Sequence, residues 1–94
     1  MTEPGARLRV DKSLTWRLLD GDVVIVSPKS GKIRVLNHVG AFIWQLIADE
    51  TTYAEIVTAL VNTYGISSEQ AQADLDAFID DLTKRELIFR EQSG

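Results

Sequence analysis

Five acidic side chains gather near the C-terminal end of the chain, where carboxylates at this density are able to do chemistry. They are Glu69, Asp74, Asp76, Asp80 and Asp81. Paired carboxylates act as general acids and bases, and they also bind divalent cations. The intervals between these five are those of a helix surface and not those of a metal-binding loop. The spacing favours a helix face that contacts solvent or a partner over a metal site or a catalytic pair.

Other residues that commonly carry catalysis are scarce in this chain. It has no cysteine, which excludes disulfides, thiol catalysis and thiolate metal sites. The only histidine, His38, has no second histidine or cysteine with which to hold zinc, and we interpret it as a surface residue. There is no glycine-rich phosphate loop and no nucleophile elbow. We therefore expect a protein that is not an enzyme and that uses no cofactor and no metal.

Length and charge set further bounds. The 94 residues suffice for one small domain. No apolar stretch resembles a signal peptide or is long enough to span a bilayer, so we expect a soluble cytoplasmic protein without membrane contact. Residues 1–36 hold seven Lys or Arg and four acids, whereas residues 37–94 hold three and ten. This separation fits either a solvated surface or a functional one, and the sequence leaves both open.

The first half of the chain has the pattern of three strands. Apolar and polar residues alternate over residues 13–19, residues 23–26 are all apolar β-formers, and residues 32–36 alternate again. Asp20 and Gly21 suit a type I′ hairpin turn, and residues 28–31 suit a second turn. The pattern predicts an antiparallel meander in which residues 32–36 form an edge strand with unpaired backbone groups.

The edge strand runs into a helix without a linker. Ile33 and Val35 alternate with charged residues, as in a half-buried strand, and Asn37 is suited to cap the helix that follows over residues 38–48. Gly40 weakens this helix by about 1 kcal/mol, so we expect it to permit the close approach of another backbone.

Capping signals predict two more helices. Residues 52–55 and residues 67–70 both have the capping-box pattern, and Gly65 suits the left-handed residue that ends a helix. The third helix is expected over residues 68–85, with a short apolar ending at residues 87–89 that returns to the core.

Together these elements give an α+β domain, a three-stranded antiparallel sheet followed by three helices in a winged helix-turn-helix-like arrangement. We expect a flexible N-terminal arm over residues 1–12, which a partner could order, and a folded domain over residues 13–90.

In and just after residues 35–44 the chain has a Leu-Asn pair, a small residue, an Ile-Trp pair and a leucine, namely Leu36, Asn37, Gly40, Ile43, Trp44 and Leu46. In this pattern it resembles the PqqD-like family, which recognises precursor peptides. The resemblance extends with less specific matches over residues 14–88. Members commonly have glycine where this chain has Glu86, which predicts a strained left-handed residue there or a different helix ending. The family's Asp-Gly after the first helix is Asp49-Glu50 here.

The resemblance implies non-catalytic binding of the leader of a ribosomally made precursor peptide, for delivery to a modifying enzyme such as a radical SAM enzyme or a leader peptidase. The leader would add a strand to the edge at residues 32–36 and lie against the helix at residues 68–85. In such a complex main-chain bonds give affinity and side-chain pockets give specificity. By position, Ile33 and Val35 would floor the groove, while Lys32 and Arg34 would pair with leader acids. The implied peptide-binding residues are Lys32, Ile33, Arg34, Val35, Leu36, Asp74, Leu75, Phe78 and Asp81.

Two alternatives remain at this point. A winged-helix regulator would bind nucleic acid through its last helix, where attraction to phosphates supplies much of the affinity. Here that helix carries the five acids and is basic only at Lys84 and Arg85, which argues against nucleic acid as a partner. The second alternative is a small dimerisation module, in which the open edge pairs with a second copy to give a homodimer.

Overall fold

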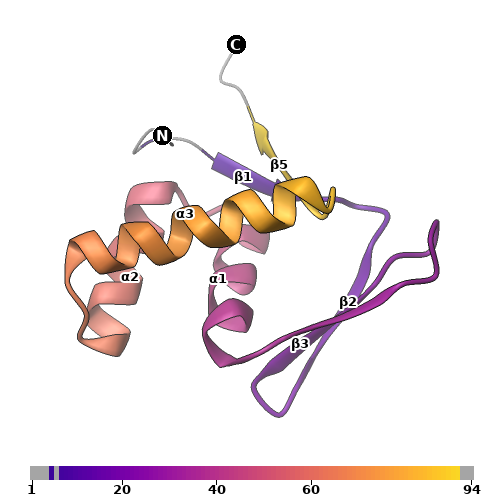
Figure 1. Cartoon of the computed structure of the whole chain (residues 1–94), viewed down its shortest axis with the longest axis horizontal. Coiled ribbons are helices and arrows are strands. Elements are labelled where there is room, and N and C mark those ends of the chain that lie inside the picture. Colours follow the sequence, from indigo (N-terminus) through magenta and orange to yellow (C-terminus); the bar gives the residue numbers. More distant parts are fainter. Residues whose placement is uncertain (1–4, 6, 92–94) are drawn as a thin grey trace.

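The computed structural model describes Gly5 and residues 7–91, and Figure 1 shows a sheet of strands that projects from a group of three helices. The elements in chain order are β1 (Arg7–Val10), β2 (Thr15–Leu19), β3 (Asp22–Val26), β4 (Ile33–Leu36), α1 (His38–Ala48), α2 (Tyr53–Tyr64), α3 (Ser68–Lys84) and β5 (Ile88–Glu91). The predicted fold class is confirmed. Within the described part of the chain, no helix combines the length and apolar character that crossing a membrane requires.

Strands β2, β3 and β4 form the predicted antiparallel meander, in that spatial order. The first turn has positive φ angles at both central residues, 51° at Asp20 and 86° at Gly21, as a type I′ turn requires. The second turn is closed by two bonds, from Gly31 N to Ser27 O at 2.7 Å and from Ser27 N to Lys32 O at 2.9 Å. This pattern, with Gly31 at φ 70°, is a G1 bulge, which fixes the register into β4.

The N-terminal segment differs from the flexible arm expected over residues 1–12. Strand β1 pairs antiparallel with β5, from Arg7 opposite Glu91 to Val10 opposite Ile88. Leu8 is completely buried, so β1 contributes to the core and the folded domain begins before residue 13. The partner strand lies at the far end of the chain, beyond the reach of any local pattern. The remaining part of the expected arm, residues 1–4 and 6, lies outside the described residues.

The helix boundaries agree closely with their predicted capping signals. The Thr52 hydroxyl accepts a bond from Glu55 N while the Glu55 carboxylate accepts one from Thr52 N, which completes the first capping box. Ser67 accepts from Gln70 N at 3.1 Å and so caps α3, but the Gln70 side chain bonds to Asp74 instead of Ser67 N, so the second capping box is only half formed. Asn37 occupies the N-cap position of α1 with an extended backbone, but its side chain makes no capping bond, contrary to expectation.

Helix α1 lies between the sheet and the other helices, where it carries the centre of the core. Trp44 is completely buried and meets Trp16 of β2 edge to face, with 6.0 Å between ring centroids. Helix α1 contacts β1, β3 and β4, whereas α3 is held by α2 and β5. Leu87 and Ile88 are buried as expected, although Phe89 is exposed. The sheet and α3 are therefore attached to different neighbours and do not close on each other.

Two glutamates occupy left-handed backbone positions at helix ends. Glu86 has φ 60° just after α3, and Glu50 has φ 61° just after α1. These are the positions at which the resembled family commonly has glycine, so the predicted strain at Glu86 is confirmed. Glu50 also forms an ion pair with Arg9 of β1 at 3.0 Å, which ties the loop after α1 to the small β1–β5 sheet.

Candidate functional site

Strand β4 has a free edge, because it pairs with β3 on one side only. Within the described residues no other strand pairs with it. The bond from Ser27 N to Lys32 O turns the Lys32 backbone toward β3. Backbone groups alternate in direction along a strand, so those of Arg34 and Leu36 also point to β3, while those of Ile33 and Val35 point outward. The free edge therefore presents the N–H and C=O groups of Ile33 and Val35.

The side chains of β4 divide between two faces, and the division corrects the expected groove floor. Arg34 lies opposite the buried Ile25, and both Arg34 and Leu36 are half-buried on the core face. Ile33 and Val35 are 69% and 59% exposed on the outer face, away from the helices. An alternating pattern does not show which set of alternate residues faces the core. An arginine can belong to the inward set, because its aliphatic stem can cover apolar surface. The core-side residues of β4 are thus Arg34 and Leu36.

Helix α3 forms a wall beside this strand. Asp74, Phe78, Asp81 and Arg85 follow one another at intervals of three or four residues and so share one stripe of the helix. At Gly40 of α1, an added Cβ would lie 3.4 Å from Phe78 Cε2 and 3.4 Å from Leu36 Cβ. Gly40 thus admits two side chains rather than the backbone that we expected. The end of β4 and α3 therefore approach each other beside Gly40.

Leu75, also predicted for this wall, lies elsewhere. It is completely buried with the other apolar residues of α3. Because Leu75 has no exposed surface, it supports the wall from within the core and cannot contact a bound peptide. The buried stripe of α3 consists of Ala71, Leu75, Ile79 and Leu82.

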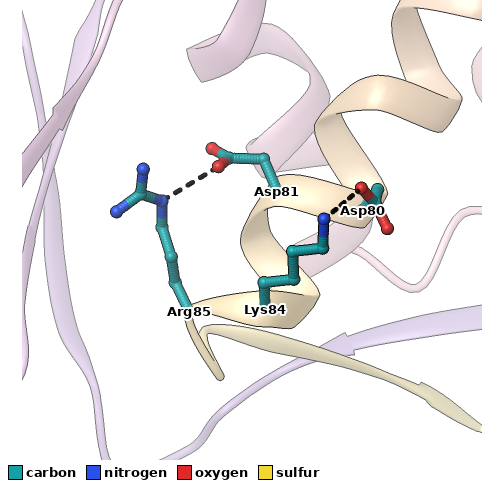
Figure 2. A network of polar contacts seen from close by, with 4 residues as sticks. All are labelled: Asp80, Asp81, Lys84 and Arg85. Carbon is teal, nitrogen blue, oxygen red and sulfur yellow. Dashed lines mark hydrogen bonds and ion pairs between the residues drawn. The ribbon is translucent and has the colours of Figure 1, made fainter.

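The acidic side chains of α3 interact largely along their own helix. Asp81 accepts a bond from Arg85 Nε at 3.0 Å, and Asp80 pairs with Lys84 Nζ at 3.2 Å (Figure 2). Asp74 accepts a bond from Gln70 Nε2 at 2.8 Å. No group of three or more metal-ligating side chains occurs in the part of the chain that the structure describes. This arrangement leaves the wall polar and exposed between Phe78 and the end of the helix.

One acid instead joins two helices. The hydroxyl of Tyr53 on α2 donates a 2.7 Å bond to Asp76 Oδ1 on α3. Burial of Tyr53, together with this bond to a carboxylate, raises the pKa of the tyrosine to about 12. The pair fixes α3 against α2 and hence fixes the position of the wall.

A groove of about 620 Å³ opens where the β3–β4 turn approaches the C-terminal end of α3. We call it the α3-end groove. No local sequence pattern indicates it, because its lining comes from three separate segments of the chain, residues 11–14, 27–32 and 83–89. Side chains from the loop after β1, the β3–β4 turn, the end of α3 and strand β5 line it, among them Asp11, Leu14, Lys29, Lys32, Arg85 and Phe89.

Comparison with known proteins gives a consistent relationship. TbiB1, solved in complex with the TbiA(beta) leader peptide, is 26% identical with a TM-score of 0.82, over 85% of this chain and 93% of that one. Lasso peptide synthetase B1, solved with its leader peptide, is 23% identical with a TM-score of 0.82, over 89% and 99%. No curated protein matches the sequence. Residues 22–88 match the family described as coenzyme PQQ synthesis protein D. Because that match spans most of the chain and includes the free strand and the helical wall, the protein belongs to the PqqD family.

Proposed function

We propose that this protein binds the leader segment of a ribosomally made precursor peptide, as a strand added to β4 beside α3. One observation carries the proposal: the outward backbone groups of Ile33 and Val35 lie on a free edge next to a helix. An extended peptide satisfies such groups with its own main chain, and its alternate side chains meet the neighbouring wall. The two structural neighbours, both solved with leader peptides, support the same assignment.

The contacts available suit a reversible carrier. Each main-chain hydrogen bond contributes about 0.5–1.5 kcal/mol after the loss of bonds to water. Leu36 and Phe78 add apolar contact at one end of the strand. A micromolar complex needs roughly 8 kcal/mol in total, of which main-chain bonds to the four outward groups supply only part, so side-chain contacts must supply the rest. Such a complex releases its guest readily, as delivery requires.

We further propose that the protein is not itself an enzyme. It would work in the cytoplasm, where precursor peptides are made, and would present the bound leader to a modifying enzyme such as a radical SAM enzyme or a leader peptidase. The polar side chains of α3 interact mainly with their own helix, which suits a binding surface better than proton transfer.

Amide hydrogen exchange tests this proposal at single residues. In the free protein the amides of Arg34 and Leu36 should exchange slowly, because they bond to β3, while those of Ile33 and Val35 should exchange fast. A bound leader peptide should then slow exchange at Ile33 and Val35. Unchanged exchange at both residues in a saturated complex would refute strand addition.

A homodimer formed through the same edge is the competing arrangement, and the same measurement detects it. Self-pairing would protect Ile33 and Val35 before any peptide is added, to an extent that increases with protein concentration. Light scattering with and without the leader measures the molar mass of the protein and so distinguishes a monomer from a homodimer. A monomer whose two amides become protected only with the peptide supports the carrier.

A further inference from the structure

The α3-end groove continues the free edge of β4. Lys32 lines the groove and directly precedes Ile33, the first residue of the strand. The groove therefore lies in line with any peptide that pairs with β4 and extends beyond its start. Pairing with β4 makes no use of the groove itself.

We propose that the α3-end groove is a second subsite for the precursor peptide, which takes an acidic residue next to an apolar one in the segment that follows the added strand. The inference rests on the proposed strand addition to β4. It adds a distinct position and a chemical preference to that mode of binding.

The direction of the guest follows from strand pairing. Every pairing in the structure is antiparallel, and antiparallel pairing is the commoner and slightly more stable form. A guest antiparallel to β4 enters beside Leu36 and leaves beside Ile33. A strand advances about 3.3 Å per residue. Roughly two to four guest residues after the one that pairs with Ile33 therefore lie beside Lys32 and Lys29.

The charge of the groove favours a carboxylate. Lys29 and Lys32 are exposed on a turn fixed by two backbone bonds, and neither forms an ion pair within the described residues. Arg85 bonds to Asp81 through Nε, which leaves its two terminal nitrogens pointing away from that carboxylate (Figure 2). The turn and the helix end thus present cationic groups to one space.

Two acids also line the groove and limit its net charge. Asp11 accepts bonds from the backbone N–H and the hydroxyl of Ser13, each at 2.9 Å. These bonds, with a smaller contribution from Lys29, hold the pKa of Asp11 below its usual range. Glu86 is the second acid. Asp11 therefore stays ionised and offsets part of the positive charge of Lys29, Lys32 and the tip of Arg85, which a guest carboxylate would meet.

Apolar surface lies beside these cations. Phe89 on β5 is 49% exposed and lines the groove together with the half-buried Leu14. Exposed aromatic rings next to buried apolar residues are typical anchor points for a bound chain. The arrangement suits a pair of adjacent guest residues, one apolar and one acidic.

A displayed library of random peptides tests the subsite independently of the natural precursor. Peptides are selected for binding to the whole protein. Protection of the Ile33 and Val35 amides then identifies those that pair with β4, so that their sequences can be aligned on the paired segment. We expect enrichment of acidic and apolar residues immediately C-terminal to the paired segment. Removing that extension from a selected peptide should weaken binding about three- to tenfold, as should Lys29→Glu or Phe89→Ala, while strand protection persists.

Arg17→Glu is the matched control, because it reverses a charge on the exposed strand β2, outside the groove. It should leave the contribution of the extension unchanged. If Lys29→Glu has no more effect than Arg17→Glu, or if the enriched acids lie N-terminal to the paired segment, the subsite is wrong although strand addition stands. If no selected peptide protects Ile33 and Val35, strand addition itself fails.

Discussion

Phe78 of α3 packs directly on Gly40 of α1, with its Cε2 atom 3.4 Å from the point that a Cβ at position 40 would occupy. Leu36 Cβ approaches the same point equally closely. Leu36, Gly40 and Phe78 therefore form the junction at which the helical wall meets the end of the edge strand. A glycine inside a helix lowers helix stability by about 1 kcal/mol relative to alanine. Here the glycine lies where α3 and the end of β4 pack closely together.

Substitutions at Gly40 should separate helix stability from the geometry of the site. Gly40→Ala fits at ordinary contact distance and should stabilise the protein by about 0.5–1 kcal/mol in denaturant unfolding, through helix propensity. Gly40→Leu should displace Phe78 and lower leader affinity, because the larger side chain overpacks the junction and costs about 1–3 kcal/mol. Equal leader affinity for both variants would show that this junction does not shape the binding groove.

The two faces of β4 should respond differently to substitution. Val35→Thr changes an exposed side chain on the outer face and keeps a β-branched shape, so leader affinity should stay within about twofold. Arg34→Gln changes a half-buried side chain on the core face and should weaken binding about three- to tenfold, if a leader acid pairs with it. Calorimetric titration measures both. The reverse order of effects would place the guest against the outer face of the sheet.

Glu86→Gly should stabilise the protein. A left-handed backbone costs a non-glycine residue about 1–2 kcal/mol, part of which returns as the greater flexibility of glycine in the unfolded chain. We expect a net gain of about 0.5–1 kcal/mol, which raises the Tm by about 3–6 °C. Glu50→Gly is the comparison. It relieves the same kind of strain but also removes the ion pair with Arg9, so its gain should be smaller. Destabilisation by Glu86→Gly would contradict this account.

Tyr53→Phe should reveal the bond between α2 and α3. The variant should lose about 1–3 kcal/mol of stability at neutral pH, because a hydrogen bond to a carboxylate is removed. The pKa of Tyr53 is raised to about 12 from an ordinary 10. Below pH 10 the hydroxyl is protonated in both states and its contribution is complete, whereas above pH 10 the unfolded chain loses the proton first and the contribution declines as pH rises toward 12. The wild type should therefore lose more stability than Tyr53→Phe over this range. Identical pH profiles would show that the bond does not form.

The helices and hairpins could be predicted from sequence because their signals act within a few residues. Thr52 and Glu55 cap each other across one helical turn, and Asp20-Gly21 adopts its turn through its own backbone preference. The free edge also followed from the order of three short strands. Family resemblance added the expectation of a leader peptide, which composition and spacing do not supply.

Only the tertiary structure decided which side of β4 faces the helices, how β1 meets β5 and where the α3-end groove opens. Alternation gives two faces but not which of them is buried, and Arg34 was able to lie inward because its stem is apolar. Strand β1 pairs with a partner at the opposite end of the chain, so no local pattern identifies the contact. The sequence alone determined the helix caps and the turns, because these depend on residues a few positions apart. The pairing of β1 with β5, the inward face of β4 and the α3-end groove depend on distant segments that meet only in the folded protein.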